Sequence, residues 1–394
     1  MSEVFLQQLG VVCALGHGVD AVRQQLLSAQ DISPLTLTER YSPGRSLPLG
    51  VVHTALPSLS HAAPRFQSRN NAMALLVLND MRAAVEAAVA RFGPSRVAVV
   101  VGTSTSGQPE GEAARAQLEK TGAWPAEFDY AQQELGNLAE FLAAELGLTG
   151  AAHVISTACS SGAKALASGA RLLNAGLADA VIAGGSDVLG ELTVAGFSAL
   201  DSVSATRCNP LSQNRNGINL GEGAALFLMT RDEGPVRLVG WGETSDAHHM
   251  SAPDPTGMGA IRAMQQALAK GGVQADQIDY LNLHGTATVH NDSMESLAVQ
   301  QVLGGAIPVS STKPLTGHTL AAAGAVEAAF CWLTLTGNPD GRLPPHWWDG
   351  ALDPALAPVR IAAPGDSLGR PARYLMSNSF AFGGSNASLL LGAG

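Results

Sequence analysis

The sequence predicts an α/β protein with largely buried sheets, and three observations support this class. Apolar runs of strand length recur along the 394-residue chain. Segments with the composition and length of helices separate many of them, an alternation that is typical of α/β folds. Only 14% of the residues are charged, whereas 46% are hydrophobic and 44 are glycine. This composition favours closely packed layers over an extensively solvated chain.

The predicted strands are short apolar runs, as expected where both faces of a sheet are covered. They are VFLQQLGVV (4–12), RVAVVVGTS (96–104), HVISTA (153–158), DAVIAGGSD (179–187), AALFLM (224–229), VRLVGWGE (236–243), YLNLHG (280–285), IPVSST (307–312) and ASLLLG (387–392). Helix-like segments rich in Ala and Leu occupy 72–93, 162–176 and 259–272. RDEGP at 231–235 separates two strands, so we place a domain boundary there and expect domains 1–233 and 234–394.

Charge and cysteine content exclude several classes of protein. A net charge of −10 argues against nucleic acid as the main partner. The four cysteines are scattered without a CxxC pair, which indicates neither a disulfide framework nor a zinc site. A reducing, cytoplasmic location is therefore expected.

Neither of two apolar segments, the N-terminus and residues 320–337, predicts a signal peptide or a membrane span. The N-terminus lacks a basic region and a cleavage site of the signal-peptide type, and is predicted to be a strand. Residues 320–337 are apolar but are interrupted by Glu327, which favours a buried core helix over a membrane span.

Cys159 lies in STACSSGAKALASG, between a predicted strand and a predicted helix. Free N–H groups and the dipole at a helix N-terminus stabilise a thiolate, which predicts a lowered thiol pKa and a nucleophile. A buried structural cysteine is the alternative, and this segment alone does not decide between the two.

Two histidines and a glycine-rich loop lie at the ends of other predicted elements. His284 lies in LHGTAT and His318 in KPLTGH, beside Gly and Thr, where function gathers in α/β proteins. Each histidine alone is more often structural. SNSFAFGGSNAS, at 377–388, is expected to be a loop in which Gly383 and Gly384 let the backbone approach a ligand, or a tight turn.

Together TACSSG, LHGTAT, KPLTGH and FAFGGSN resemble, in order and spacing, the β-ketoacyl-acyl carrier protein synthases, and the resemblance covers nearly the whole chain. It implies a thiolase-like fold of two similar halves in five layers (α-β-α-β-α), active as a dimer. It also implies that an acyl chain on Cys159 condenses with a malonyl thioester after decarboxylation. SRNNAMALLVL, YAQQELGNLAEFL and NGINLGEGAA further resemble the ketosynthases of bacterial aryl polyene pathways.

The resemblance implies a role for each further site residue. His284 and His318 stabilise the enolate, and backbone N–H groups of Cys159 and Phe382 form an oxyanion hole. Lys313 supports the site through Glu295 or Glu327. The resemblance also implies that Thr286 and Thr288 bind the phosphopantetheine arm, that Gly383 and Gly384 contact substrate, and that Phe380 gates the acyl pocket.

The implied partners are an acyl carrier protein and either a second copy or a chain-length-factor subunit. No metal and no cofactor of its own are expected, because phosphopantetheine of the carrier protein carries the substrates. Arg65, Arg69 and Arg207 are candidates for a basic docking patch, or are ordinary surface arginines.

Several positions depart from the family pattern. Ala381 replaces the usual glycine of the gate, and Ser212 and Asn216 replace acids near the expected carrier-protein surface. Val289 replaces a proline, and the His290 that follows it is expected to be a loop residue without a catalytic role.

Four alternatives account for the motifs less well. A thiolase needs a second catalytic cysteine near the C-terminus, but none follows Cys331. Condensing enzymes with a Cys-His-Asn set have Asn where this chain has His318. Non-catalytic chain-length factors typically lack the nucleophile that Cys159 supplies, and a non-enzymatic α/β binding protein would leave four matched motifs as coincidence.

Overall fold

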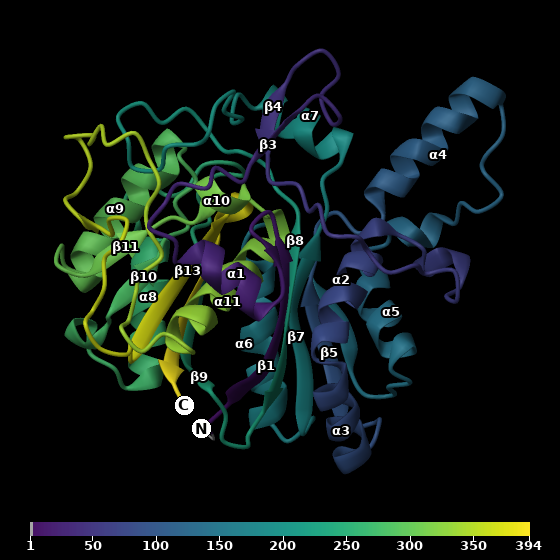
Figure 1. Ribbon diagram of the computed structural model, residues 1–394, viewed down its shortest axis with the longest axis horizontal. Coiled ribbons are helices and arrows are strands. Elements are labelled where there is room, and N and C mark those ends of the chain that lie inside the picture. The colour runs from purple at the N-terminus through teal and green to yellow at the C-terminus, as the bar shows by residue number, and fades with distance from the viewer. Residues whose placement is uncertain (1–2) are drawn as a thin grey trace.

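Two sets of five strands follow one another along the chain and pair in the same order. The computed structural model describes residues 3–394 (Figure 1). Its strands are β1 (Phe5–Cys13), β2 (Gly16–His17), β3 (Thr36–Thr38), β4 (Leu47–Leu49), β5 (Val97–Gly102), β6 (Ala152–Ile155), β7 (Ala180–Asp187), β8 (Gly223–Thr230), β9 (Val236–Ser245), β10 (Tyr280–Asn282), β11 (Pro308–Ser310), β12 (Arg360–Ile361), β13 (Tyr374–Ala381) and β14 (Ser385–Ala393). Its α-helices are α1 (Val19–Leu26), α2 (Arg69–Asp80), α3 (Arg82–Phe92), α4 (Gln108–Thr121), α5 (Asn137–Glu145), α6 (Ser161–Asn174), α7 (Glu191–Ala199), α8 (Met258–Gly271), α9 (Val289–Leu303), α10 (Lys313–Thr316) and α11 (Ala323–Leu335).

The strand order shows that the two halves repeat one topology. From the centre outward, the first half runs β1-β8-β7-β5-β6 and the second runs β9-β14-β13-β10-β11, with β12 added at the edge. In each half the inner two pairings are antiparallel and the next two are parallel. A short antiparallel pairing of β1 with β9 joins the two sheets.

Helices α6 and α11 form the central layer between the sheets, and each follows the third strand of its half. They pack so closely that only glycine fits at the crossing. A Cβ on Gly162 would lie 2.7 Å from the Ala325 nitrogen, and one on Gly324 would lie 2.7 Å from the Ala163 nitrogen. One hydrophobic core contains residues of both helices and of strands from both sheets. This symmetric contact brings the starts of the two helices together.

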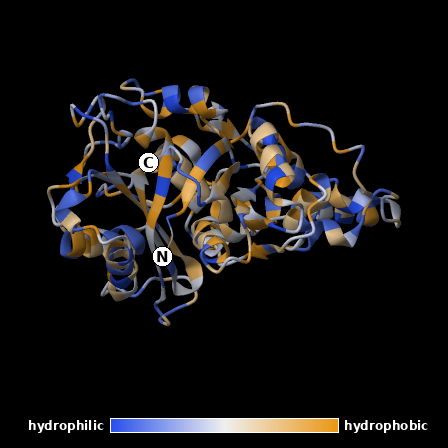
Figure 2. Ribbon diagram, turned by 90° about the horizontal axis from the view of Figure 1, so that it is seen from below, coloured by the Kyte–Doolittle hydropathy of each residue, from blue (hydrophilic) through white to orange (hydrophobic). Residues whose placement is uncertain are grey.

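Separate cores cover the outer faces of the two sheets. Helices α2, α3 and α5 pack on the first sheet, and α8 and α9 pack on the second. Figure 2 shows hydrophobic and hydrophilic residues on the strands and on the outer helices alike. The five predicted layers are thus confirmed: outer helices, a sheet, the central helices, a second sheet and outer helices.

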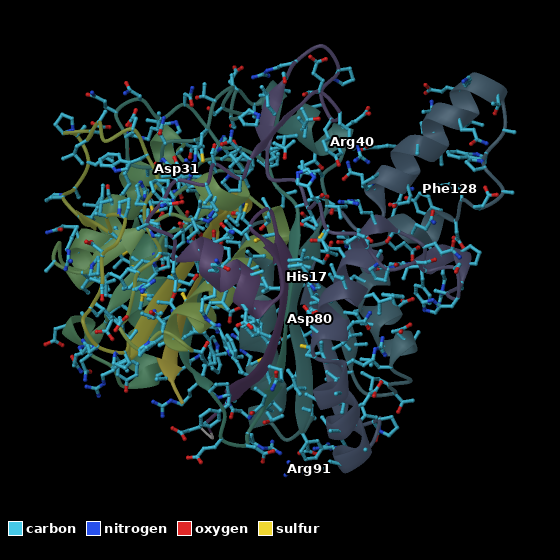
Figure 3. All side chains as sticks on the ribbon, viewed as in Figure 1. His17, Asp31, Arg40, Asp80, Arg91 and Phe128 are labelled. Atoms are coloured by element: carbon cyan, nitrogen blue, oxygen red, sulfur yellow. The ribbon has the colours of Figure 1, made fainter. Side chains whose placement is uncertain are left out.

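Smaller elements attach to this body. Figure 3 shows His17 beside Asp80, and their 3.0 Å contact ties β2 to the end of α2. Helix α4 extends away from the body in Figure 1, and the β3–β4 pair lies beside α7.

Most predicted elements are present, with two differences. The segment 377–388 was expected to be a loop, but its first part completes β13, a central strand, and only Phe382–Gly384 forms the turn into β14. The predicted helix 72–93 is two helices, because the backbone leaves helical geometry at Met81 (φ −119°). Residues 320–337 contain the buried helix α11, as predicted. Among residues 3–394, no helix is long and apolar enough to cross a membrane.

Candidate active site

Equivalent turns in the two halves of the fold place a cysteine and a histidine side by side. Cys159 lies between β6 and α6, and His318 lies in the corresponding connection between β11 and α11. Ala158 has a positive φ of 50°, so the chain turns sharply between strand and helix and directs Cys159 inward. His284 follows β10, the strand next to β11. The duplicated fold therefore brings together three residues that are far apart in sequence.

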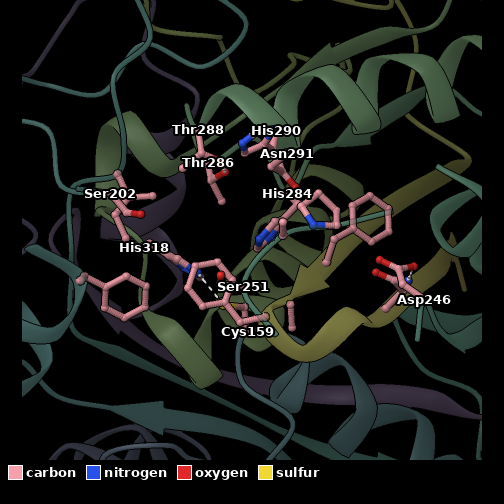
Figure 4. Close-up of a pocket in the computed structure, with 18 residues that line it drawn as sticks. Cys159, Ser202, Asp246, Ser251, His284, Thr286, Thr288, His290, Asn291 and His318 are labelled. Atoms are coloured by element: carbon pink, nitrogen blue, oxygen red, sulfur yellow. Dashed lines mark hydrogen bonds between the residues drawn. The ribbon is translucent and has the colours of Figure 1, made fainter. Parts of the chain in front are cut away.

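The three side chains form one buried cluster (Figure 4). His318 Nε2 lies 2.9 Å from Cys159 Sγ. The two imidazole rings are 5.4 Å apart between centroids and nearly perpendicular. Sγ and one nitrogen of each ring all lie within 4.8 Å of one another. A small carbonyl-containing group placed among them would meet all three.

Both imidazoles are neutral at pH 7, and Lys313 fixes the tautomer of one. Burial, reinforced by the positive charge of Lys313, lowers the pKa of His284 and of His318 well below 6.5. Lys313 Nζ lies 3.5 Å from His284 Nδ1. An ammonium only donates, so Nδ1 accepts and the ring proton is on Nε2. His284 thus offers an N–H donor to the cavity.

Lys313 forms an ion pair with Glu327. The sequence had left Glu295 and Glu327 as its two possible carboxylate partners. Lys313 Nζ lies 2.5 Å from Glu327 Oε1, and both residues are buried. It also donates to the backbone carbonyl of His284. Burial raises the pKa of Glu327 to about 7, and Lys313 opposes this rise.

Glu295 holds the backbone of the His284 turn instead. Its two oxygens accept hydrogen bonds from the backbone N–H groups of His284 (2.8 Å) and Gly285 (2.7 Å). Burial raises the pKa of Glu295 to about 7, and these hydrogen bonds oppose the rise. Its position supports a structural role over direct proton transfer, because the backbone N–H donors occupy its oxygens.

The thiol differs from the sequence prediction. Although Cys159 directly precedes the N-terminal cap of α6, burial raises its pKa to about 11 rather than lowering it. Lys313 and the backbone N–H groups of Phe382 and of Cys159 itself oppose this rise. Desolvation outweighs the helix terminus, so the resting residue is a thiol whose proton His318 can accept. The two N–H groups converge on the sulfur, where the predicted oxyanion hole would lie.

Alkylation of Cys159 is expected to accelerate about tenfold per pH unit from pH 7 to 9, without a plateau. A raised pKa leaves a small thiolate fraction that keeps growing through this range, whereas a free cysteine levels off near its pKa of about 8.5. The measurement is the rate of iodoacetamide labelling of the Cys159 peptide by mass spectrometry. A plateau below pH 8 would contradict the raised pKa.

Two cavities meet at Cys159. The first contains the predicted pantetheine residues Thr286 and Thr288, whose hydroxyls are hydrogen-bonded to each other at 2.8 Å. The second has a volume of about 540 Å³. Its wall is mostly apolar and includes Leu192, Gly196, Phe197 and Leu200 from α7 and the loop after it.

Phe382, rather than Phe380, lies between these cavities. Phe382 lines both of them, is 37% exposed and packs against Phe197 with ring centroids 5.7 Å apart. Phe380 lines only the first and is buried in β13 beside His284. The place between the cavities thus belongs to Phe382, and the gate role of Phe380 stays a prediction. Sequence could not separate the two residues, because Phe380 at the end of β13 and Phe382 in the turn after it were expected to share one loop.

Gly383 and Gly384 shape the turn but do not line either cavity. Both have positive φ (82° and 72°), and a Cβ on Gly384 would lie 2.8 Å from that of Asp246. Their positive φ angles set the turn that follows Phe382, and contact with substrate stays a prediction. His290 lies in the first turn of α9, not in a loop, and its side chain faces the first cavity (Figure 4).

The arginines of the predicted docking patch are mostly engaged elsewhere. Arg69 pairs with the buried Glu222 at 2.6 Å, and Arg207 pairs with Asp31 at 2.6 Å. Arg65 is half exposed and lies 3.8 Å from Glu140. Of the three arginines, Arg65 has the most exposed side chain and is therefore the one that a docking partner could reach best.

The structure also shows the surroundings of Ser212, and it reveals two polar residues on the wall of the first cavity that the sequence did not identify. Ser212 is buried and donates to Asp349 at 2.8 Å, and Asn216 is exposed. Asp246 and Asn386 line the first cavity and are hydrogen-bonded at 2.6 Å. Asp246 directly follows β9 and Asn386 lies at the start of β14, so each is at the end of an apolar run, which is the signal that could have identified them.

Asp187, at the end of β7, connects the second cavity to the His318 segment. It is fully buried and accepts six hydrogen bonds of 2.6–2.9 Å. Five of these hydrogen bonds come from residues 103–105, and one comes from the backbone N–H of Ala321. Ser104 and Thr105 also line the second cavity. The Asp187 carboxylate thus joins residues 103–105 to the segment that contains Ala321.

Replacement of Asp187 by alanine is expected to lower the free energy of unfolding by about 3 kcal/mol or more. The substitution leaves buried N–H and O–H donors without an acceptor, each of which costs about 1–3 kcal/mol. Urea denaturation measures the change. Asp232→Ala, which removes an exposed ion pair with Arg91, is the control and should change stability by less than about 1 kcal/mol. Equal effects of the two substitutions would contradict this role.

The geometry of the cluster fits a hydrogen bond better than a metal centre. Among residues 3–394, Cys159, His284 and His318 form a group of potential ligands. Tetrahedral zinc with its usual bond lengths would separate a sulfur from a nitrogen ligand by about 3.5 Å. The observed 2.9 Å between Sγ and Nε2 is shorter. The absence of a metal requirement stays a prediction.

A duplicated five-layer fold in which one half supplies a cysteine and the other two histidines defines a condensing enzyme of the thiolase type. Residues 9–234 match the family model "Beta-ketoacyl synthase, N-terminal domain" and residues 236–346 match "Beta-ketoacyl synthase, C-terminal domain". The chain belongs to the β-ketoacyl synthase family, the condensing enzymes of acyl chain elongation, as the motifs predicted.

Similarity to individual proteins extends along the chain. It is 33% identical over 313 residues to 3-oxoacyl-[acyl-carrier-protein] synthase 2 of Staphylococcus aureus, covering 75% of this chain and 76% of that one. The solved structure of a ketosynthase (ApeO) in complex with its chain length factor (ApeC) from Xenorhabdus doucetiae is 43% identical, with a TM-score of 0.92 and coverage of 100% and 98%. A β-ketoacyl synthase from Burkholderia phymatum is 28% identical, with a TM-score of 0.83 and complete coverage of both chains.

Proposed function

We propose that this β-ketoacyl synthase elongates acyl chains carried on an acyl carrier protein, with Cys159 as the nucleophile. The 2.9 Å contact between His318 Nε2 and Cys159 Sγ carries the proposal, because it places a proton acceptor on a thiol that is otherwise protonated. Sγ attacks the thioester carbonyl of the acyl donor. The bond from that carbonyl to the pantetheine sulfur breaks, and the thiol proton passes to the departing sulfur through His318.

The second stage forms the new carbon–carbon bond. The malonyl thioester loses carbon dioxide, and the electron pair of the broken bond becomes an enolate. The N–H of His284, fixed by Lys313, and that of His318, in the tautomer that carries its proton on Nε2, stabilise the enolate oxygen. The enolate carbon then attacks the acyl carbonyl on Cys159, whose oxygen the N–H groups of Cys159 and Phe382 hold. The bond to Sγ breaks, and Sγ takes up a proton from solvent through His318 to become a thiol again. Thr286 and Thr288 are positioned to contact the pantetheine arm.

The pathway and partners belong to the same proposal. The 43% identity with the structure of ApeO with ApeC supports an aryl polyene type of elongation and a chain-length-factor partner over a homodimer. The relatives that act on acyl carrier proteins support such a partner here. Cytoplasmic action without a bound cofactor remains a prediction, and so do the domains 1–233 and 234–394.

Intact-protein mass spectrometry tests this function directly. The protein is mixed with a panel of acyl-carrier thioesters, alone and with a chain-length-factor subunit, and the modified peptide is mapped. An adduct on Cys159 is expected, and its mass reveals the preferred chain. An adduct only with the added subunit would show an obligate heterodimer, and no adduct under either condition would favour a non-catalytic chain-length-factor role.

A further inference from the structure

The two N–H groups of the oxyanion hole belong to opposite halves of the chain. The Cys159 N–H precedes α6 of the first half, and the Phe382 N–H lies in the turn between β13 and β14 of the second. Their separation must be fixed closely, because an oxyanion accepts from both donors only in a narrow geometry. Side chains that link the Cys159 segment to the Phe382 turn should therefore influence the rate of the reaction.

Ser385, three residues after Phe382, is the point where the segments are joined. Lys164, in the second turn of α6, donates to Ser385 Oγ at 2.6 Å. Ser160 Oγ, next to Cys159, lies 3.2 Å from the same oxygen. Ser160 is fully buried, and it also contacts the Thr157 carbonyl at 2.9 Å. Two side chains at the start of the helix that follows the nucleophile thus converge on the hydroxyl of Ser385.

We propose that Lys164 is a positioning residue of the oxyanion hole, which through Ser385 holds the Phe382 turn against the start of α6. The proposal rests on the proposed function of Cys159. Lys164 touches neither the thiol nor either histidine among the described hydrogen bonds, and it acts through Ser385.

The surroundings of Lys164 support this role over that of an ordinary surface lysine. In the described part of the chain, no carboxylate lies within ion-pair distance of it, and Arg171, the charged neighbour that acts on it, is itself paired with Glu243. Burial and the positive charge of Arg171 lower the pKa of Lys164. A half-buried ammonium without a carboxylate depends on its hydrogen bond to Ser385 for stabilisation.

The partial reactions distinguish positioning from general stability. The oxyanion hole acts on the acyl carbonyl, whereas His284 and His318 act on the enolate. We therefore expect Lys164→Met and Ser385→Ala to slow acylation of Cys159 about 10- to 100-fold, the scale of a misplacement of about 1 Å. Decarboxylation of malonyl carrier protein should remain within about twofold of the parent, because its donors are unchanged.

The experiment measures both rates in the full-length protein. The probes are the acyl carrier thioester that labels the parent best and radiolabelled malonyl carrier protein, with release of carbon dioxide as the second readout. Lys270→Met, a half-buried lysine of α8 with a similarly lowered pKa, is the matched control and should leave both rates unchanged. Lys164→Arg should recover part of the acylation rate, because a long cationic donor is restored.

Each outcome decides the proposal. The double variant should resemble the single variants, since both substitutions break the same link. Unchanged acylation in Lys164→Met, or an equal loss of both partial reactions, would overturn the positioning role. A parent protein that is never acylated would instead overturn the proposed function of Cys159.

Discussion

Cys159→Ala is expected to eliminate the acyl adduct and to reduce chain elongation by about 10⁴-fold or more, as is usual when a covalent nucleophile is removed. Sγ is the atom at which both cavities and the backbone N–H groups of Cys159 and Phe382 converge. None of the other cysteines can substitute, because Cys13, Cys208 and Cys331 line neither cavity. Decarboxylation of malonyl carrier protein should persist, because the two histidines that stabilise the enolate are unchanged.

Elongation is measured as formation of the β-ketoacyl carrier protein by mass spectrometry. Cys13→Ala is the matched control, since Cys13 is also buried but lies in β1 outside both cavities. That variant should elongate at the parental rate. Normal elongation by Cys159→Ala would show that the chemistry uses another nucleophile.

The sequence was sufficient to predict the architecture because the strands are short and apolar and the helices between them are rich in alanine. It failed at β13, where Ser377, Asn378 and Ser379 suggest a loop. These polar residues are tolerated in a central strand because buried partners satisfy some of them; Asn378, for example, donates to Glu295. Without β13, the sequence also could not show that Phe380 is buried beside His284 while Phe382 lines both cavities, since a side chain's direction depends on its register in the strand.

Charge and burial at the site were harder to predict than residue identity. The motifs identified Cys159, His284, His318 and Lys313, all of which the structure brings together. The helix terminus predicted a lowered pKa for Cys159, but desolvation depends on every segment packed around the sulfur. Likewise, spacing alone left Lys313 with two possible carboxylate partners, and only the fold shows Glu327 beside it.

Duplication explains how one site obtains unlike functional groups. The β6–α6 turn and the β11–α11 connection are equivalent positions, and the central helices meet at Gly162 and Gly324. The same position thus supplies Cys159 in one half and, in the other, His318, whose Nε2 lies 2.9 Å from the Cys159 sulfur. The buried centre also removes water, which strengthens hydrogen bonds to a developing enolate.

His284→Ala is expected to reduce decarboxylation of malonyl carrier protein about 10²- to 10³-fold, the cost of one lost donor of about 2.7–4 kcal/mol. Acylation of Cys159 should change little, because His284 makes no hydrogen bond to Sγ in the described structure. His318→Ala is expected to reduce decarboxylation by a similar factor and also to slow acylation, because His318 Nε2 contacts the thiol at 2.9 Å. The two histidines therefore differ in the acylation step.

The two rates are measured separately, as carbon dioxide release and as acyl adduct formation. His284→Gln should recover part of the decarboxylation rate, since a side-chain amide N–H can replace the Nε2 donor. His61→Ala, at an exposed histidine paired with Glu145, is the control and should change neither rate. Parental decarboxylation in both His284→Ala and His318→Ala would exclude the histidines from enolate stabilisation. Equal acylation rates in those two variants would show that His318 does not accept the thiol proton.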